Sequence, residues 1–194
     1  MIQYTVVDDE QIESVSVRGS PPQYQEIVIA DYDPDWPRWF EQAAERIGSA
    51  LGDKVLRLDH VGSTAVPGLP AKPLIDINLV VDDTTDEDAY VPPLEAIGYE
   101  LRVREPDWYQ HRLLRGHDPP VNLHVFPPNC EELPRMLRFR DHLRANEADR
   151  ELYARTKREL AAQEWKYVQN YADAKSAVVQ DILSRAGADR TAGV

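Results

Sequence analysis

The spacing of apolar residues along this chain changes about two thirds of the way to its end. In the first part, apolar residues form short runs at 27–29, 55–58 and 74–81 and alternate with polar residues at 99–103, 108–114 and 121–126. These patterns predict strands. From residue 131 to residue 186 the apolar residues recur at helical spacing instead. The whole pattern predicts an α+β fold whose helical third closes over the sheet.

Two helices are predicted between the strands. The first is expected to begin with Asp33 as its N-cap and Pro34 at its first helical position, because these residue types favour those positions. Trp36 and Phe40 follow at helical spacing, and we expect them to pack into the core rather than stack on a substrate. The second helix is predicted to end at Gly98.

The length of 194 residues suits one domain. We expect that domain over residues 25–186, with the sheet core at about 25–128 and the helical part at about 131–186. Three apolar stripes mark the helical part, with Asn146 as an N-cap after the first helix. Residues 1–24 are polar and contain turn-forming residues, which predicts a loose leader with a short strand at 2–7.

Composition limits the function classes. The formal net charge is −12 and the pI is about 4.8, which argues against broad binding to nucleic-acid backbones. No apolar run has the length of a membrane span and no signal pattern is visible, so we expect a cytoplasmic protein that does not bind membranes. The single cysteine, Cys130, rules out an internal disulfide and is expected to be an ordinary thiol.

The residues that point to chemistry lie in one stretch, 60–78. It is predicted to form a strand, a loop of small and turn-forming residues, and a second strand. Gly62 permits close backbone approach, and Ser63 offers a hydroxyl group and an N–H to a phosphate. Lys72 is a cation beside this turn. Asp76 lies inside an apolar run, where a carboxylate is costly without a partner, and a hard divalent cation is one such partner.

Residues 60–77, HVGSTAVPGLPAKPLIDI, resemble the signature of the GrpB family, also called UPF0157. The resemblance continues at 32–37, 123–125, 139–144 and 171–176 and spans roughly residues 25–186. It implies a nucleotidyltransferase-like fold of the DNA polymerase β superfamily, a short mixed sheet flanked by helices with a C-terminal helical segment packed on it. The family is also similar to a domain appended to dephospho-CoA kinase in some bacteria.

The resemblance assigns roles by position. Gly62 and Ser63 match the superfamily's turn and Asp76 its first carboxylate, whereas Asn78 stands where the second would be. The third position falls on Asn122 or His124. Such a set would hold one Mg²⁺ weakly, leaning on substrate phosphates; a transition metal held by His124 and His60 is the alternative. The predicted catalytic residues are Asp76 and His124, the metal ligands Asp76 and Asn78, and the substrate-binding residues His60, Gly62, Ser63, Thr64, Lys72, Asn78, Arg140 and Lys175.

Several of these residues have a second interpretation. His60 is equally well explained as a histidine that bonds the loop backbone, and His124 as an ordinary strand residue. Asp76 has an ion pair with Arg112 or Arg140 as its alternative. The other three histidines, His111, His117 and His142, are expected to be structural or exposed.

Two functions follow from this stretch. The first is transfer of a nucleotidyl or phosphoryl group from a Mg-NTP to a small acceptor. The second is a binding module for a nucleotide or CoA-like ligand, in which the fold is kept and the chemistry lost, because two carboxylate positions are not acidic. In both, the partner is a nucleotide or another phosphate-bearing small molecule. A scaffold that binds only a protein partner has no particular support in the sequence.

Overall fold

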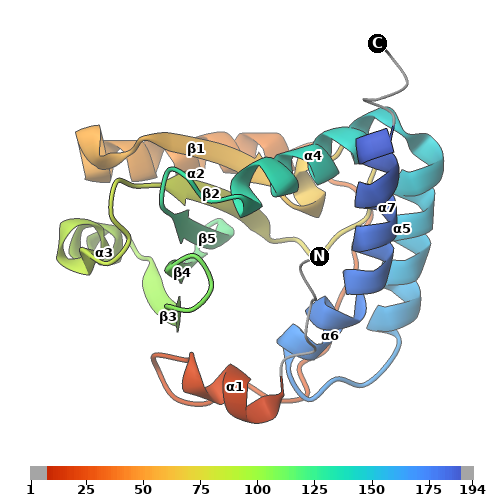
Figure 1. Ribbon diagram of the computed structural model, residues 1–194, viewed down its shortest axis with the longest axis horizontal. Helices are drawn as coiled ribbons and strands as arrows, with labels where there is room; N and C mark the ends of the chain where they lie inside the picture. The colour runs from red at the N-terminus through yellow and green to blue at the C-terminus, as the bar shows by residue number, and fades with distance from the viewer. Residues whose placement is uncertain (1–7, 189–194) are drawn as a thin grey trace.

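The computed structural model describes residues 8–188. Its centre is a five-stranded sheet in the order β1-β2-β5-β4-β3 (Figure 1). The β2–β5 pair is parallel and the other three pairs are antiparallel. The strands are β1 (Arg57–Val61), β2 (Ile75–Val80), β3 (Glu100–Glu105), β4 (His111–His117) and β5 (Pro120–Phe126). This mixed sheet, flanked by helices and with the C-terminal helical segment packed on it, confirms the predicted fold.

One face of the sheet packs on α2 (Trp36–Leu51) and α3 (Glu87–Ala96). Ile77 and Leu79 of β2 and Leu123 and Val125 of β5 are fully buried there. Because side chains alternate along a strand, the residues between them point to the opposite face. The predicted alternation of β5 is confirmed: Asn122 and His124 are half-buried on that second face, between fully buried neighbours.

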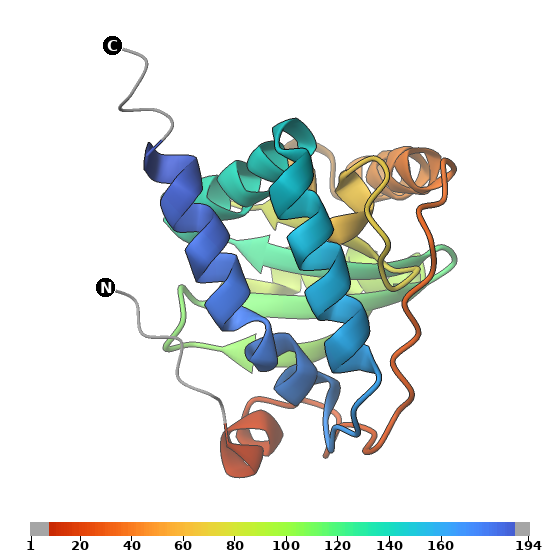
Figure 2. The same ribbon diagram turned by 90° about the vertical axis from the view of Figure 1, so that its right-hand side faces the viewer.

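Helices from the last third of the chain cover the second face. Figure 2 shows α5 and α7 crossing in front of the strands, with α4 behind their upper ends. The helices are α4 (Glu132–Ala145), α5 (Glu147–Ala161), α6 (Val168–Ala174) and α7 (Ser176–Ala188). Asn146 caps α5 as predicted, accepting a hydrogen bond from the backbone N–H of Asp149 at 3.0 Å. Within residues 8–188, no helix is both long and apolar enough to cross a bilayer.

Three local predictions differ from the structure. Helix α2 begins at Trp36, because the Asp33 carboxylate accepts the backbone N–H of Asp35 and closes a turn before it. Residues 27–29 form no strand; backbone pairing occurs only next to them, between Ala30 and Ala71. Strand β4 begins at His111, because Tyr109 and Gln110 adopt positive φ angles in a turn.

Residues 8–24, expected to be a loose leader, contain helix α1 (Asp9–Ser14). Beyond it, Ser16 forms an isolated bridge with Val103, and the backbone N–H of Val17 donates to the Arg102 carbonyl at 2.9 Å. Strand β3 is an edge strand, so its outer backbone groups are free to pair with this segment. The strand predicted at 2–7 lies outside the described residues.

Candidate functional site

The predicted bend and the predicted acid are in contact. Val61, the last residue of β1, pairs with Asp76 in β2, so Gly62 emerges beside the Asp76 side chain. Gly62 has φ +69°, and a Cβ placed on it would lie 2.4 Å from Oδ2 of Asp76. Only glycine allows both this backbone conformation and this approach. The hairpin therefore places Gly62, Ser63 and Asp76 side by side, and we call this group of residues the hollow.

Asp76 is held by neighbours on β5. The Asn122 side-chain amide donates to Asp76 Oδ1 at 3.0 Å, and Nε2 of His124 lies 3.7 Å from the same oxygen. The Asp76 side chain is 30% exposed, so part of it reaches solvent. Burial raises the pKa of Asp76, but His124, the Asn122 amide and the Lys72 ammonium outweigh burial and hold the pKa below its ordinary value. Asp76 is therefore ionised at neutral pH.

The arginines considered as partners of Asp76 bond elsewhere. Arg112 pairs with Glu87 at 2.6 Å. Arg140 donates to the His60 carbonyl at 3.0 Å and pairs with Asp141 at 2.7 Å, so it fastens α4 to β1. The arginine that reaches the site is Arg115 of β4.

Arg115 is linked to Asp76 through the side-chain amide of Asn122. Its guanidinium donates to Oδ1 of Asn122 at 2.6 Å, while the Asn122 amide nitrogen donates to Asp76. The strand register explains this line, because Asp76, Asn122 and Arg115 are directly paired across β2, β5 and β4. A guanidinium remains charged at all relevant pH values, so it adds a positive charge near the carboxylate.

Two lysines add further positive charge. Lys72, between β1 and β2, and Lys175, between α6 and α7, approach the same Tyr171 ring, at 5.7 and 4.4 Å from its centroid. Burial lowers the pKa of Lys72, although the Asp76 charge opposes this. Burial and then repulsion by Lys72 lower the pKa of Lys175 to about 8. The Lys175 ammonium is therefore still mainly protonated at pH 7.

Helix α5 closes the hollow with Tyr153 and Lys157, one turn apart. The Tyr153 side chain is hydrogen-bonded to Ser63, which ties the helix to the bend. Lys157 is 2% exposed and donates to the Pro70 carbonyl. Burial lowers its pKa to about 6, so this amine is mostly neutral at pH 7 and adds little charge to the site.

His60 and Thr64 support the bend from the other side. His60 is paired with Ile77, on the face that packs on α2. Its Nε2 lies 3.0 Å from the Thr64 hydroxyl, and its ring stacks on Phe40 with centroids 4.8 Å apart. Burial lowers the pKa of His60 to about 4, so the ring is neutral. His60 thus bonds a side chain of the loop, whereas its second interpretation named the loop backbone.

Asn78, predicted as a metal or substrate ligand, is on the same face as Asp76 but is covered. It is 0% exposed, and its amide nitrogen lies 3.3 Å from the Met136 sulfur on α4. Its Oδ1 has no hydrogen-bond partner among the described residues. The position matching the second carboxylate is thus shielded from the hollow.

These residues do not fit a divalent cation held by the protein alone. Among residues 8–188, no group of three or more His, Cys, Asp or Glu side chains is arranged to hold a metal ion. Asp76 has cations around it, and the Asn122 carbonyl already accepts from Arg115. His60 and His124 lie on opposite faces of the sheet, which removes the transition-metal alternative. A Mg²⁺ requirement remains a prediction tied to substrate phosphates.

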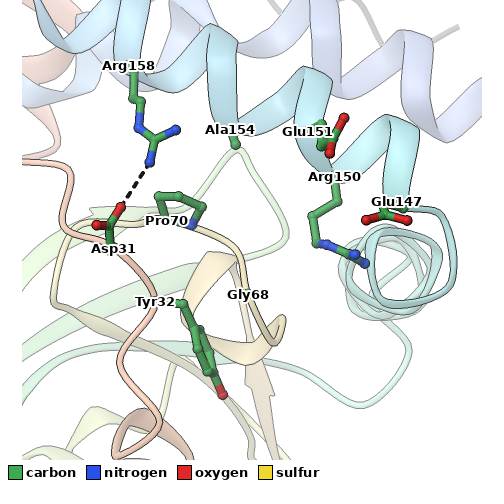
Figure 3. A pocket seen from close by; sticks show the side chains of 9 residues that line it. All are labelled: Asp31, Tyr32, Gly68, Pro70, Glu147, Arg150, Glu151, Ala154 and Arg158. Atoms are coloured by element: carbon green, nitrogen blue, oxygen red, sulfur yellow. Dashed lines mark hydrogen bonds and ion pairs between the residues drawn. The ribbon is translucent and has the colours of Figure 1, made fainter.

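A separate surface pocket of about 430 Å³ lies beyond the loop, between the segment at 31–32, the segment at 68–70 and α5. Figure 3 shows the Arg158–Asp31 ion pair at one side of it, beside Pro70. Its lining residues are Asp31, Tyr32, Gly68, Pro70, Glu147, Arg150, Glu151, Ala154 and Arg158. Three acids and two arginines leave no excess of positive charge there, unlike the hollow over Asp76.

Sequence reasoning missed Arg115, Tyr153, Lys157 and His111 as members of the site. His111, expected to be structural or exposed, is 3% exposed and lies 3.1 Å from His124, from His111 Nε2 to His124 Nδ1. Arg115 fell just outside the strand predicted at 108–114, so its face could not be assigned. A signal for Lys157 was present, because this charge lies one turn after Tyr153 in an apolar stripe.

Comparisons with known proteins agree on one family. The profile of the family described as GrpB protein matches residues 26–185. A UPF0157 protein of Halalkalibacterium halodurans is 56% identical over 180 residues, covering 93% of this chain and 92% of that protein. The crystal structure of the conserved protein GrpB from Enterococcus faecalis has a TM-score of 0.71 and 31% identity, covering 82% of this chain and 96% of that one.

A shorter match connects the chain with a larger protein. The dephospho-CoA kinase of Mycolicibacterium paratuberculosis is 41% identical over 92 residues, covering 46% of this chain but only 20% of the kinase.

Proposed function

The chain belongs to the GrpB family, and we propose that the hollow over Asp76 binds a phosphate-bearing small molecule of the nucleotide or CoA type. The observation that carries this proposal is the charge around Asp76. One carboxylate is surrounded by Lys72, Lys175 and Arg115, so positive charge is in excess in a protein whose net charge is −12. A local excess of cations attracts anions, and phosphates most strongly.

Each part of such a ligand has a partner in the hollow. The two ammonium groups and the Arg115 guanidinium would neutralise phosphate oxygens. The partial relatives are named dephospho-CoA kinases, and this name supports a ligand of the CoA or nucleotide class.

A second candidate is transfer of a nucleotidyl or phosphoryl group from a Mg-NTP to a small acceptor. The neighbouring acceptors Asp76 and His124 favour it, because a carboxylate or imidazole beside an acceptor hydroxyl can take its proton. For this second function, the Mg²⁺ ion would enter the site together with the nucleotide, coordinated by the phosphates of the nucleotide.

Ligand binding measured by calorimetry tests the proposal and separates the two candidates. ATP and dephospho-CoA are titrated with EDTA and, separately, with Mg²⁺. For metal-free binding, Lys72→Gln and Lys175→Gln should each weaken affinity on the order of tenfold. Lys54→Gln is the matched control, because Lys54 is exposed and donates to the Ala89 carbonyl away from the site.

Asp76→Asn gives opposite results for the two candidates. If phosphates bind without metal, removing the carboxylate charge relieves repulsion and should tighten binding several-fold. If Asp76 contacts the Mg²⁺ of an incoming nucleotide, the substitution should abolish the Mg²⁺-dependent part of binding. Failure of ATP, dephospho-CoA and pyrophosphate to bind under either condition would refute the proposed function.

A further inference from the structure

Helix α6 is short, yet it supports two residues of the proposed ligand site. It has seven residues, fewer than an isolated helix needs to be stable in water. Tyr171, inside it, forms the ring that Lys72 and Lys175 approach, and Lys175 follows directly after its last residue. The position of the Lys175 ammonium therefore depends on contacts that hold α6 from outside.

The N-terminal segment supplies such contacts at Tyr167, the residue before α6. The Tyr167 hydroxyl donates to the Glu13 carboxylate of α1 and accepts from the Gln23 side-chain amide at 3.2 Å. Tyr167 is only 1% exposed. Loss of these two partners would therefore leave a buried polar group unpaired, which is costly.

The preceding residue, Lys166, is held by the same segment. Its ammonium is paired with Asp9 of α1. Its carbonyl accepts from the backbone N–H of Tyr24 at 2.8 Å. Residues 9–13 and residues 23–24 thus meet at the connection between α5 and α6, although they are far from it in the sequence.

The part of the segment between these contacts is fastened to the sheet. The backbone N–H of Arg104 in β3 donates to the Val15 carbonyl at 3.0 Å, and the backbone N–H of Val17 donates to the Arg102 carbonyl at 2.9 Å. Ile12 of α1 is 5% exposed, so the inner side of that helix is buried. In Figure 1, α1 lies below β3 and α6. The segment therefore connects the edge of the sheet with the start of α6.

We propose that residues 8–24 act as a strap that fixes α6, and that Glu13 and Tyr167 are positioning residues for Lys175. By tying the start of the helix to the sheet, the strap keeps the Lys175 ammonium at the hollow and raises the affinity for a phosphate-bearing ligand. The effect on affinity rests on the proposed function, whereas the effect on α6 is a property of the protein alone. The family profile begins at residue 26, so the strap supports the site from outside the part of the chain that the profile matches.

The effect on α6 is measured without ligand, by hydrogen exchange of its backbone amides. Glu13→Ala removes the acceptor of the Tyr167 hydroxyl. The protection of the α6 amides should then fall about tenfold, the effect of one lost hydrogen bond to a charged group. Unchanged protection of α6 in this variant would overturn the proposal.

Two further variants separate this contact from a general effect of changing α1. Glu13→Gln keeps an oxygen that accepts from Tyr167, so it should retain most of the wild-type protection. Glu10→Ala is the matched control, because Glu10 is an exposed glutamate of the same helix. Within residues 8–188, Glu10 has no hydrogen bond or ion pair to residue 166 or 167. A loss of protection in Glu10→Ala as large as that in Glu13→Ala would contradict the positioning role of Glu13.

Ligand affinity decides whether the strap acts through Lys175. The probe is the one of ATP, dephospho-CoA and pyrophosphate that binds the wild-type protein most tightly, titrated by calorimetry. Glu13→Ala should weaken its binding about threefold, because α6 is in place in fewer molecules. Removal of an acid would by charge alone favour an anion, so the two effects differ in sign. In a Lys175→Gln background Glu13→Ala should have no further effect, whereas in Lys72→Gln its effect should remain.

Each outcome bears on a separate part of the proposal. Equal affinity of Glu13→Ala and the wild type, or an equal loss in the Lys175→Gln and Lys72→Gln backgrounds, would overturn the positioning of Lys175. A protein that is only less stable stays folded at the temperature of the titration and would show no such dependence on Lys175. If none of the three probes binds the wild-type protein, the proposed function fails, and hydrogen exchange still decides whether the strap fixes α6.

Discussion

Gly62 and Asp76 leave each other no room for a further atom: a Cβ on Gly62 would lie 2.4 Å from the Asp76 carboxylate oxygen and 3.0 Å from the Asp76 Cβ. The second distance involves an atom close to the backbone, which cannot swing away as the end of a flexible side chain can. The bend and the acid are therefore one unit, and neither can change without moving the other.

Gly62→Ala should lower the free energy of unfolding by several kcal/mol. The positive φ alone costs an L residue about 1 kcal/mol, and the contact with Asp76 adds to it. Gly68→Ala is the matched control, because Gly68 also has a positive φ, +78°, but no atom within 4 Å of the added Cβ. Urea denaturation of both variants measures the difference, and equal losses would contradict the close contact.

Tyr171→Phe should leave stability unchanged or raise it slightly. The Tyr171 ring is 1% exposed, and its hydroxyl has no hydrogen-bond partner among the described residues. The hydroxyl group loses its hydrogen bonds to water when the protein folds, and removing it avoids this cost of about 1 kcal/mol. Tyr171→Leu should instead destabilise the protein, because the ring beneath Lys72 and Lys175 is lost. Thermal melts compare the two, and a destabilised Phe variant would indicate a partner for the hydroxyl.

Asp149→Ala should destabilise the helical part by about 2 to 4 kcal/mol. Asp149 is 6% exposed and joins α4, α5 and α7, because it lies 2.6 Å from His142 and 2.7 Å from Arg185. Breaking a buried ion pair leaves its partner uncompensated. Asp181→Ala is the control: it removes an exposed partner of the same Arg185 and should cost less than 1 kcal/mol. Denaturation curves should rank the variants in this order.

Stability should fall as the pH drops from about 6.5 to about 4. Both His60 and His111 have an ordinary pKa of 6.5 and a pKa of about 4 in the folded protein. Between these pH values the two histidines bind protons in the unfolded chain but not in the folded protein, so lower pH favours unfolding. Each histidine adds up to about 1.4 kcal/mol per pH unit. Above the window both forms are neutral and the effect ends.

His60→Gln isolates one of these two contributions. Its amide can still bond the Thr64 hydroxyl but does not titrate. The free energy of unfolding, measured between pH 6.5 and 4, should therefore depend less steeply on pH than in the wild type, by up to the slope that the uptake of one proton gives. Glu87 and Asp149, whose pKa values are lowered mainly by arginine hydrogen bonds, lose their contribution only as the pH falls below about 4.5. An unchanged slope in His60→Gln would show that the pKa of His60 is not lowered in the folded protein.

Much of the fold could be predicted from local patterns. The hairpin of β1 and β2 with its bend, the alternation of β5 and the cap at Asn146 each depend on residues close in sequence. The start of β4 could not be predicted in this way. Tyr109 and Gln110 adopt positive φ angles that their residue types do not favour, and the three-residue shift hid the face on which Arg115 lies.

The amino-acid sequence alone determined that one acid stands in an apolar strand after a glycine and serine bend, because alternation and turn chemistry are local. Only the tertiary structure decided which charges meet that acid. Lys72, Arg115 and Lys175 come from segments far apart in the chain, brought together by strand register and by helices packed across the sheet. The tertiary structure also decided which side chains carry a charge. His60 and Lys157 are neutral because packing removes water from them, and this packing depends on contacts over the whole domain.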